Sequence, residues 1–243
     1  MTIKVAVVGA TGRMGKLALD LIDAAQDLTL HAALDSKSEL AELLGADVVF
    51  DVTLPDVSPK VVEFCVANGL KVVVGTSGWS AAKLAVVEKH LTDAPSAAVI
   101  IIPNFSIGSM LATKFAAEAA RYFDSMEIIE AHHAGKIDSP SGTAVRTAEL
   151  MAAARADMTQ PLIPGVGQEA RGQVVAGVPI HSIRLAGISA KQEILFGGES
   201  EVLSISHDVS STRSYVQGIL LCLRKAVSAT GLTVGLQAVV EGK

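Results

Sequence analysis

The sequence predicts an α/β fold in which a parallel sheet forms one domain and an open mixed sheet forms a second, α+β domain. In the first hundred residues, short apolar runs rich in β-branched residues alternate with helical patterns. After Pro103 this alternation stops, and a long helical stretch precedes a polar loop. Beyond residue 180, strand-like runs follow one another without helices between them. Strands that are apolar on both faces and linked by helices are typical of parallel sheets covered by helices.

The first domain is predicted from five strands. Each run is short and apolar, and an amphipathic segment follows it. The runs are Ile3–Val8, Leu28–Leu34, Asp47–Val52, Lys71–Val74 and Ala98–Ile102. Because strands joined by helices run in the same direction, their carboxyl ends are expected to meet at one edge of the sheet.

The second domain is predicted to begin with a helix and to end with an open sheet. Its predicted elements, in order, are helix Ile107–Phe123, a strand from Met126 to about Ala131, helix Ser141–Arg155, and strands His181–Leu185, Glu193–Phe196 and Val202–His207. Residues 157–179 are polar and contain several glycines and prolines, so a long irregular connection is expected there. A last helix, about Tyr215–Val227, leads into a tail, Leu232–Val240, of alternating small and apolar residues.

The composition excludes several classes of protein. Half of the 243 residues are hydrophobic and 19% are charged, which excludes a disordered or fibrous chain. The net charge of −5 argues against nucleic acid as the main partner. No apolar run approaches the roughly 18 residues of a membrane span and no signal-like segment opens the chain, so we expect a cytoplasmic protein without a membrane partner. Cys65 and Cys222 lie in apolar runs without metal-type spacing, so buried thiols and no metal site are expected.

A glycine-rich turn follows the first strand. Gly9, Gly12 and Gly15 open a helix in the spacing G-x-x-G-x-x-G, an arrangement that binds a pyrophosphate, although such turns also join strands to helices for steric reasons alone. Asp35 ends the second strand, where an acid commonly accepts from an adenosine ribose, and further polar loops follow the fourth and fifth strands. The candidate dinucleotide-binding residues are Gly9, Ala10, Thr11, Gly12, Arg13, Met14, Gly15, Asp35, Lys37, Gly75, Thr76, Ser77, Pro103, Asn104 and Phe105.

The choice between the two nicotinamide cofactors depends on the loop after the second strand. Asp35 would repel a 2′-phosphate, which favours NADH, whereas Lys37 and Arg13 could each partly neutralise one. We therefore expect both NADH and NADPH to be used, with NADH at least as good.

The segment Glu130–Ala144 concentrates residues that suit a carboxylate-bearing substrate. It reads E-A-H-H-A-G-K-I-D-S-P-S-G-T-A. Histidine can give or take a proton near neutral pH, and Lys136 adds a fixed cation. Ser141–Thr143 supplies hydroxyl and N–H donors at a helix start, which favours an anion. The alternative is a capped helix that follows a polar surface loop.

At Glu130, His132, His133, Lys136, Asp138 and Pro140–Ala144 the chain resembles the dihydrodipicolinate reductases of bacterial lysine and diaminopimelate synthesis, and its short loops resemble the actinobacterial branch. The segments G-T-S-G at residues 75–78 and P-N-F-S-I-G at residues 103–108 also match that family. The resemblance implies a discontinuous Rossmann-like nucleotide domain of residues 1–104 and 213–243. Residues 105–212 would form the substrate-binding and tetramerisation domain.

The same resemblance implies a function and a set of roles. The protein would transfer a hydride from NADH or NADPH to the dehydrated form of 4-hydroxy-tetrahydrodipicolinate, a small dicarboxylate. His132 would be the proton donor, and Lys136, catalytic as well, would bind a carboxylate. The other substrate-binding residues would be His133, Ser141, Gly142 and Thr143. A homotetramer built on the last sheet is expected.

Three questions stay open at this point. Arg184 matches a family position near the substrate pocket, but it could equally be a strand residue that pairs at a subunit interface. A related amino-acid-type dehydrogenase on the same fold is an alternative function. A non-catalytic NAD(H)-binding regulator is another, because a fold alone does not identify an activity.

Overall fold

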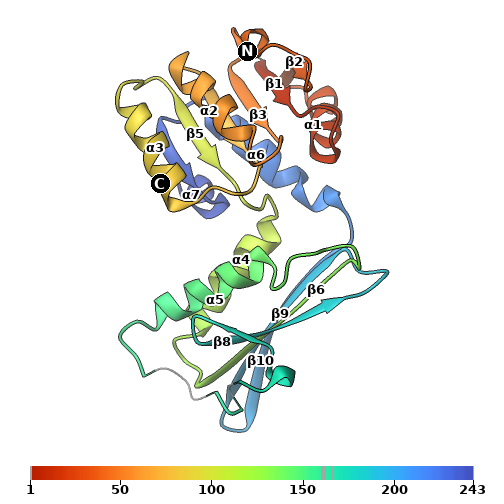
Figure 1. Ribbon diagram of the computed structural model, residues 1–243, viewed down its shortest axis with the longest axis vertical. Helices are drawn as coiled ribbons and strands as arrows, with labels where there is room; N and C mark the ends of the chain where they lie inside the picture. The colour runs from red at the N-terminus through yellow and green to blue at the C-terminus, as the bar shows by residue number, and fades with distance from the viewer. Residues whose placement is uncertain (1, 160–162, 166, 243) are drawn as a thin grey trace. The chain divides into compact units, whose positions relative to one another are not determined.

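A computed structural model of the chain describes residues 2–159, 163–165 and 167–242. The chain divides into two compact units (Figure 1). Unit 1 comprises Met1–Ile107 and Thr212–Lys243, and unit 2 comprises Gly108–Ser211. Of the irregular connection predicted over residues 157–179, residues 160–162 and 166 lie outside the described part. Within the described residues, no helix is long and apolar enough to cross a membrane.

Unit 1 contains a six-stranded sheet in the order β11-β5-β4-β3-β1-β2, and every pair of neighbours in it is parallel. The strands are β1 (Ile3–Val8), β2 (Leu28–Leu34), β3 (Val48–Asp51), β4 (Lys71–Val74), β5 (Ala98–Ile101) and β11 (Gly231–Val234). The five strands predicted from the first hundred residues are thus present, to within one residue at each end. The sixth, β11, comes from the C-terminal tail and extends the sheet beside β5.

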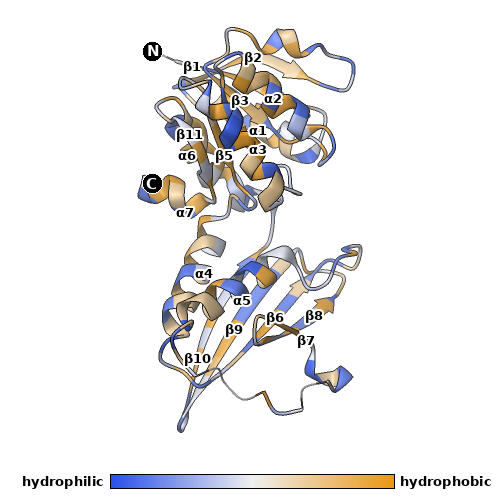
Figure 2. Ribbon diagram, turned by 60° about the vertical axis from the view of Figure 1, so that its left-hand side comes forward, coloured by the Kyte–Doolittle hydropathy of each residue, from blue (hydrophilic) through white to orange (hydrophobic). Residues whose placement is uncertain are grey.

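Helices cover both faces of this sheet. They are α1 (Arg13–Ala24), α2 (Ser58–Ala67), α3 (Ala81–Thr92), α6 (Val216–Ala226) and α7 (Leu236–Glu241), with short 3-10 turns η1 (Leu40–Leu43) and η3 (Thr212–Tyr215). Helices α1 and α6 contact each other on one face, and α2 and α3 contact each other on the opposite face (Figures 1 and 2). Because both faces are covered, consecutive β1 residues Val5, Ala6 and Val7 are all fully buried.

Unit 2 contains a five-stranded mixed sheet in the order β10-β9-β6-β8-β7. The strands are β6 (Ser125–His132), β7 (Gln173–Val175), β8 (Val178–Arg184), β9 (Ala190–Gly198) and β10 (Glu201–Val209). Strands β6 and β8 are parallel, and the other pairs are antiparallel. The sheet therefore agrees with the predicted open mixed sheet. Strand β7 and a 3-10 turn, η2 (Glu169–Arg171), were not predicted, because three-residue elements carry no readable periodicity.

Two helices, α4 (Ile107–Ala119) and α5 (Gly142–Ala154), pack on one face of the unit 2 sheet (Figure 2). Ile128 and Met151 are fully buried in the core between them. Side chains alternate along a strand, so Glu130 and His132 share the helix-facing side of β6 with Ile128. Glu127 and Ile129 point to the opposite face.

Candidate active site

The carboxyl ends of the unit 1 strands bring the glycine-rich turn and the other predicted nucleotide loops to one edge. Strand β1 lies between β2 and β3, so the next two strands of the chain lie on opposite sides of it and the strand order reverses there. Such a reversal is where open α/β sheets bind nucleotides. The Cβ of a residue other than glycine at position 9 would lie 2.8 Å from the carbonyl oxygen of Val52, which follows β3. The turn is therefore packed directly against the neighbouring loop.

The turn from Gly9 to Gly15 needs its first and third glycines for steric reasons. Gly9 has a φ of +87°, and a Cβ at Gly15 would lie 2.2 Å from the Gly9 carbonyl oxygen. Gly12 is the N-cap of α1 and makes no side-chain capping bond, and the first turn of α1 contains no acid. The first-turn N–H groups have no intrahelical acceptor, so they can bind an anion. Thr11 and Arg13 are exposed beside them.

Buried polar and apolar groups lie side by side in the loops after β4 and β5. Thr76 is buried, and its Oγ1 has no hydrogen-bond partner within the described residues. A buried hydroxyl without a protein partner is expected to hydrogen-bond to a ligand or a water molecule. Phe105 is 4% exposed, and its ring lies 5.6 Å from the Phe50 ring. A Cβ at Gly75 would lie 2.8 Å from the Phe105 ring, so Gly75 leaves room for this ring.

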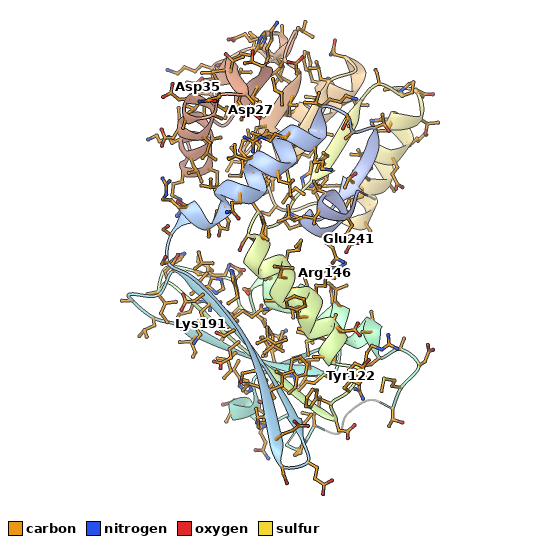
Figure 3. The ribbon with its side chains drawn as sticks, turned by 180° about the vertical axis from the view of Figure 1, so that it is seen from behind. Asp27, Asp35, Tyr122, Arg146, Lys191 and Glu241 are labelled. Atoms are coloured by element: carbon orange, nitrogen blue, oxygen red, sulfur yellow. The ribbon has the colours of Figure 1, made fainter. Side chains whose placement is uncertain are left out.

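The loop after β2 presents one carboxylate to solvent. Asp35, labelled in Figure 3, is exposed, and its Oδ1 accepts hydrogen bonds from the N–H of Lys37 and from the hydroxyl of Ser38. Its Oδ2 has no partner among the described residues and can accept from a ribose hydroxyl. The Lys37 side chain is exposed, and no ion pair with Asp35 is present in the described part of the chain.

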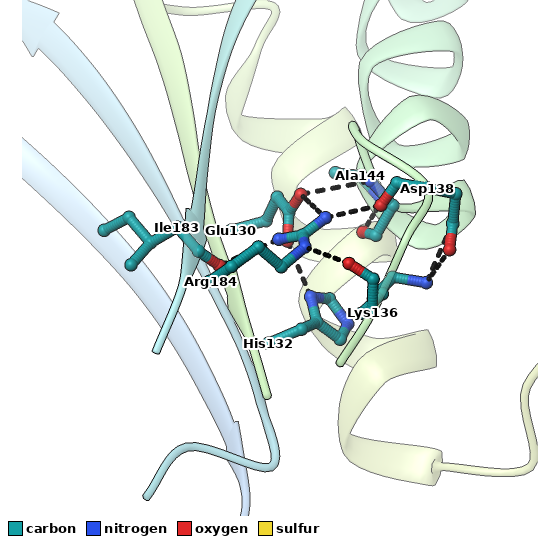
Figure 4. A network of polar contacts seen from close by, with 8 residues as sticks. Glu130, His132, Lys136, Asp138, Ala144, Ile183 and Arg184 are labelled. Atoms are coloured by element: carbon teal, nitrogen blue, oxygen red, sulfur yellow. Dashed lines mark hydrogen bonds and ion pairs between the residues drawn. The ribbon is translucent and has the colours of Figure 1, made fainter. Parts of the chain in front are cut away.

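In unit 2, a buried glutamate lies at the centre of the histidine motif (Figure 4). Glu130 is 0% exposed, and its Oε2 lies 2.6 Å from His132 Nδ1. Arg184 donates to both carboxylate oxygens of Glu130, at 3.0 and 2.9 Å. Burial raises the pKa of Glu130, but hydrogen bonds from Arg184, Ser182 and His132 outweigh it and hold that pKa below its usual value. Glu130 is therefore a carboxylate at neutral pH.

The same carboxylate contacts the start of α5. The N–H of Ser141 donates to Glu130 Oε1 at 3.2 Å, and the Ser141 hydroxyl caps the helix by accepting from the N–H of Ala144. The N–H groups of Gly142 and Thr143 lie in the first turn, where a helix offers them no acceptor. With the helix dipole, these groups are of the kind that can bind an anion, and Glu130 links this N-terminus to His132.

Lys136 and His133 lie in the loop between β6 and α5. Both oxygens of Asp138 accept from Lys136 Nζ, at 2.7 and 2.8 Å. The cation that is predicted to bind a substrate carboxylate is therefore already paired with Asp138. His133 is exposed. The loop is held by Arg184, which donates to the carbonyl oxygens of Lys136 and Asp138 at 3.2 and 2.6 Å. Arg184 thus lies inside this cluster through β8, the parallel neighbour of β6.

The structure therefore brings His132, Lys136 and Ser141–Thr143 into one cluster of unit 2, and the nucleotide loops into another of unit 1. Sequence reasoning missed the part played by Glu130, although the motif contains it. A usable signal existed: the spacing E-x-H in a strand puts both side chains on one face. A glutamate on the buried face of a strand needs partners, and histidine is one.

Comparisons with known proteins identify the family of both parts of the chain. Residues 3–105 match the family described as dihydrodipicolinate reductase, N-terminus, and residues 108–240 match dihydrodipicolinate reductase, C-terminus. A protein of Clavibacter sepedonicus named 4-hydroxy-tetrahydrodipicolinate reductase is 54% identical over 241 residues, covering 99% of this chain and 87% of the relative. One of the same name from Streptomyces griseus is 47% identical over 245 residues, covering 97% and 96%.

Among the solved structures that match, one belongs to the same family and another shares the fold alone. A dipicolinate-bound dihydrodipicolinate reductase from Paenisporosarcina sp. TG-14 has a TM-score of 0.85 and 32% identity, and the match covers 98% of this chain and 99% of that one. An amine dehydrogenase from Mycobacterium smegmatis has a TM-score of 0.61 at 12% identity, with 96% and 95% covered, which shows the fold alone. On these matches, and on the Glu130–Ala144 motif that carries the site, the chain belongs to the dihydrodipicolinate reductase family.

Proposed function

We propose that this protein reduces the dehydrated form of 4-hydroxy-tetrahydrodipicolinate to tetrahydrodipicolinate, with NADH or NADPH as the reductant. One observation carries the proposal: a single buried carboxylate, Glu130, contacts both a histidine at the end of β6 and the N-terminus of α5. A group that can donate a proton is thereby placed beside a site that can hold a carboxylate. Reduction of a cyclic unsaturated imine dicarboxylate needs both.

The residues of unit 1 fit a nicotinamide dinucleotide. The N-terminus of α1 would hold the pyrophosphate, Asp35 would accept from a ribose hydroxyl, and Gly75–Ser77 with Pro103–Phe105 would line the nicotinamide. The unpartnered hydroxyl of Thr76 supports a ligand in that loop. When bound, the cofactor supplies the hydride. Because Asp35 is exposed, we propose that NADH is used at least as well as NADPH.

The residues of unit 2 would hold the substrate and supply the proton. The α5 N-terminus would bind one carboxylate through Ser141, Gly142 and Thr143, while Lys136 and His133 would bind another. His132 would donate its proton to the carbon next to the one that receives the hydride, and a general acid of this kind contributes about 10²–10⁴ in rate. The Paenisporosarcina reductase is described as dipicolinate-bound; we propose that dipicolinate also binds this protein, at the N-terminus of α5.

A coupled assay tests the proposal. Fresh product of dihydrodipicolinate synthase is mixed with the protein and NADH or NADPH, and the absorbance of the reduced nicotinamide is followed for the wild type and His132→Ala. We expect oxidation by the wild type, and a rate at least about 100-fold lower for the variant with cofactor affinity retained. Binding of NADH without any oxidation would instead support a non-catalytic regulator.

We also propose that the protein is a homotetramer assembled on the unit 2 sheet. The face of this sheet opposite α4 and α5 carries Ile129, Ile183, Leu195 and Val202, and we call it the open face. Ile183 and Val202 are 45% and 72% exposed, and within the described residues no α-helix packs over them. Apolar sheet faces of this kind are commonly covered by a second copy of the chain.

A further inference from the structure

We propose that Glu130 is a positioning residue that fixes the ring of His132 and the first turn of α5 relative to each other. The inference rests on the proposed function, in which His132 gives up a proton and α5 holds a carboxylate. Glu130 touches neither substrate nor cofactor in this account. It acts on the reaction through the two groups that it holds.

Glu130 is fully buried, and both of its carboxylate oxygens accept hydrogen bonds. Arg184 Nη1 and His132 Nδ1 meet Oε2 at 3.0 and 2.6 Å, while Arg184 Nη2 and the N–H of Ser141 meet Oε1 at 2.9 and 3.2 Å. A buried charge of this kind is tolerated only with a partner charge and several donors. These contacts, together with the hydrogen bond from Ser182, hold the carboxylate in one orientation.

The contact with Glu130 also decides which nitrogen of the His132 ring carries a hydrogen. A carboxylate can only accept, so the short contact with Glu130 requires a hydrogen on His132 Nδ1. The other ring nitrogen, Nε2, is then the atom that carries the exchangeable proton. Without the carboxylate, the ring could rotate or carry its proton on the other nitrogen, and Nε2 would no longer be held toward the site.

Glu130 also connects the loop after β6 to the start of α5. Arg184, held by Glu130, also donates to the carbonyl oxygens of Lys136 and Asp138, and Glu130 itself holds the N–H of Ser141. The end of β6, the loop with Lys136 and the α5 N-terminus therefore share one anchor (Figure 4). Loss of the carboxylate should therefore disturb the placement of the proton donor relative to the anion site.

A purely structural ion pair is the alternative, and the chain contains a matched control for it. Glu127 lies three residues away on β6, on the opposite face, and is likewise paired with one arginine and one histidine, Arg171 and His181. Glu127→Gln removes a similar set of contacts from the same strand and leaves His132 untouched. The variant Glu130→Gln is compared with it throughout.

The experiment begins with nitrogen NMR of the histidine rings across a pH titration, with His132 assigned by its loss in His132→Ala. In the neutral ring of His132 we expect the hydrogen to lie on Nδ1 in the wild type and in Glu127→Gln. In Glu130→Gln we expect a mixture of tautomers. A wild-type His132 with its neutral proton on Nε2 would overturn the proposal, whether or not the variant folds.

Kinetics supply the second readout. We expect kcat of Glu130→Gln to fall by about 10–100-fold, part of the contribution of a general acid, with Kd for NADH unchanged and dipicolinate affinity reduced less than kcat. Glu127→Gln should retain the wild-type kcat. Equal losses in the two variants would overturn the proposal. If the wild type itself shows no turnover, the proposed function fails, while the NMR result still decides whether Glu130 sets the tautomer.

Discussion

The side chain of Lys136 is held by a carboxylate of its own loop. Asp138 is well exposed, and the hydrogen bond from Lys136 holds the pKa of the Asp138 carboxyl below its usual value. Asp138 is therefore ionised at neutral pH and competes with any substrate carboxylate for Lys136. A substrate carboxylate that binds Lys136 must either share the ammonium group with Asp138 or displace it.

This competition predicts opposite effects for two substitutions. Asp138→Asn should lower the substrate KM by about 1.4- to fivefold, the equivalent of the roughly 0.2–1 kcal/mol of an exposed ion pair. Lys136→Ala should raise KM, because the cation is lost. Steady-state kinetics on both variants measure this. A higher KM for Asp138→Asn would mean that Asp138 orders the loop and does not compete with substrate.

Asp35 is a second single residue whose charge predicts a property of the protein, its preference between NADH and NADPH. Asp35→Asn keeps the acceptor for the Lys37 N–H but removes the charge that would repel a 2′-phosphate. We expect the ratio of kcat/KM for NADPH over NADH to rise by about tenfold. Asp20→Asn, an equal change of charge at an exposed position of α1, should leave the ratio unchanged. An unchanged ratio in Asp35→Asn would place the ribose elsewhere.

At the scale of elements, the N-terminus of α5 combines two tasks. Ser141 caps the helix, and it also belongs to the proposed carboxylate site. Ser80 caps α3 in the same way, by accepting from the N–H of Lys83, and is assigned no contact with substrate. A comparison of substitutions at the two serines therefore separates an effect on helix stability from an effect on ligand binding.

Ser141→Ala and Ser80→Ala should each lower the free energy of unfolding by about 1 kcal/mol, the usual value of an N-cap. Only Ser141→Ala should also raise the substrate KM. Urea unfolding and steady-state kinetics on both variants check the prediction. If KM is unaffected in Ser141→Ala, the serine is a cap alone and the carboxylate is bound by other groups.

For the whole molecule, the paired carboxylates of β6 predict how stability depends on pH. Burial raises the pKa of Glu127, but bonds from Arg171 and His181 outweigh it and lower that pKa overall. A lowered pKa means that the carboxylate stabilises the fold above the unfolded pKa of glutamate, about 4.3. This stabilisation is lost as the pH falls from there through the lower pKa of the folded state.

Glu127→Gln should therefore be less stable than the wild type by about 1 kcal/mol at neutral pH, and the difference should shrink as the pH falls through this window. Urea unfolding at a series of pH values measures it. A difference that is the same at every pH would show that the variant loses packing and not the charged interaction.

The proposed tetramer is tested on the whole protein by size-exclusion chromatography with light scattering. We expect a mass of about 100 kDa, since four copies of a 25.1 kDa chain assemble. Val202→Glu, on the open face, should give a smaller species. Tyr122→Glu, which is similarly exposed at 75% but follows α4, should not. A wild-type mass of one chain would exclude the tetramer.

Much of the architecture could be predicted because it depends on local patterns. Five strands of unit 1 and helix α5 follow from runs whose side chains are buried on both faces or on one stripe, and burial favours the same residues wherever they occur. The candidate residues followed from chemistry that short motifs display. Strand β7 and turn η2 could not be predicted, because so few residues show no period.

The sequence by itself determined the order of the longer elements, the family motif and the residue types that the reaction needs, because these depend on neighbours along the chain. Only the tertiary structure decided that Arg184 and Ser141, which are 54 and 11 positions from Glu130, meet on its carboxylate. Strand pairing and burial decide such contacts. An unpaired charge is costly to bury. A buried charge without partners nearby in the sequence is therefore paired with groups from other parts of the fold.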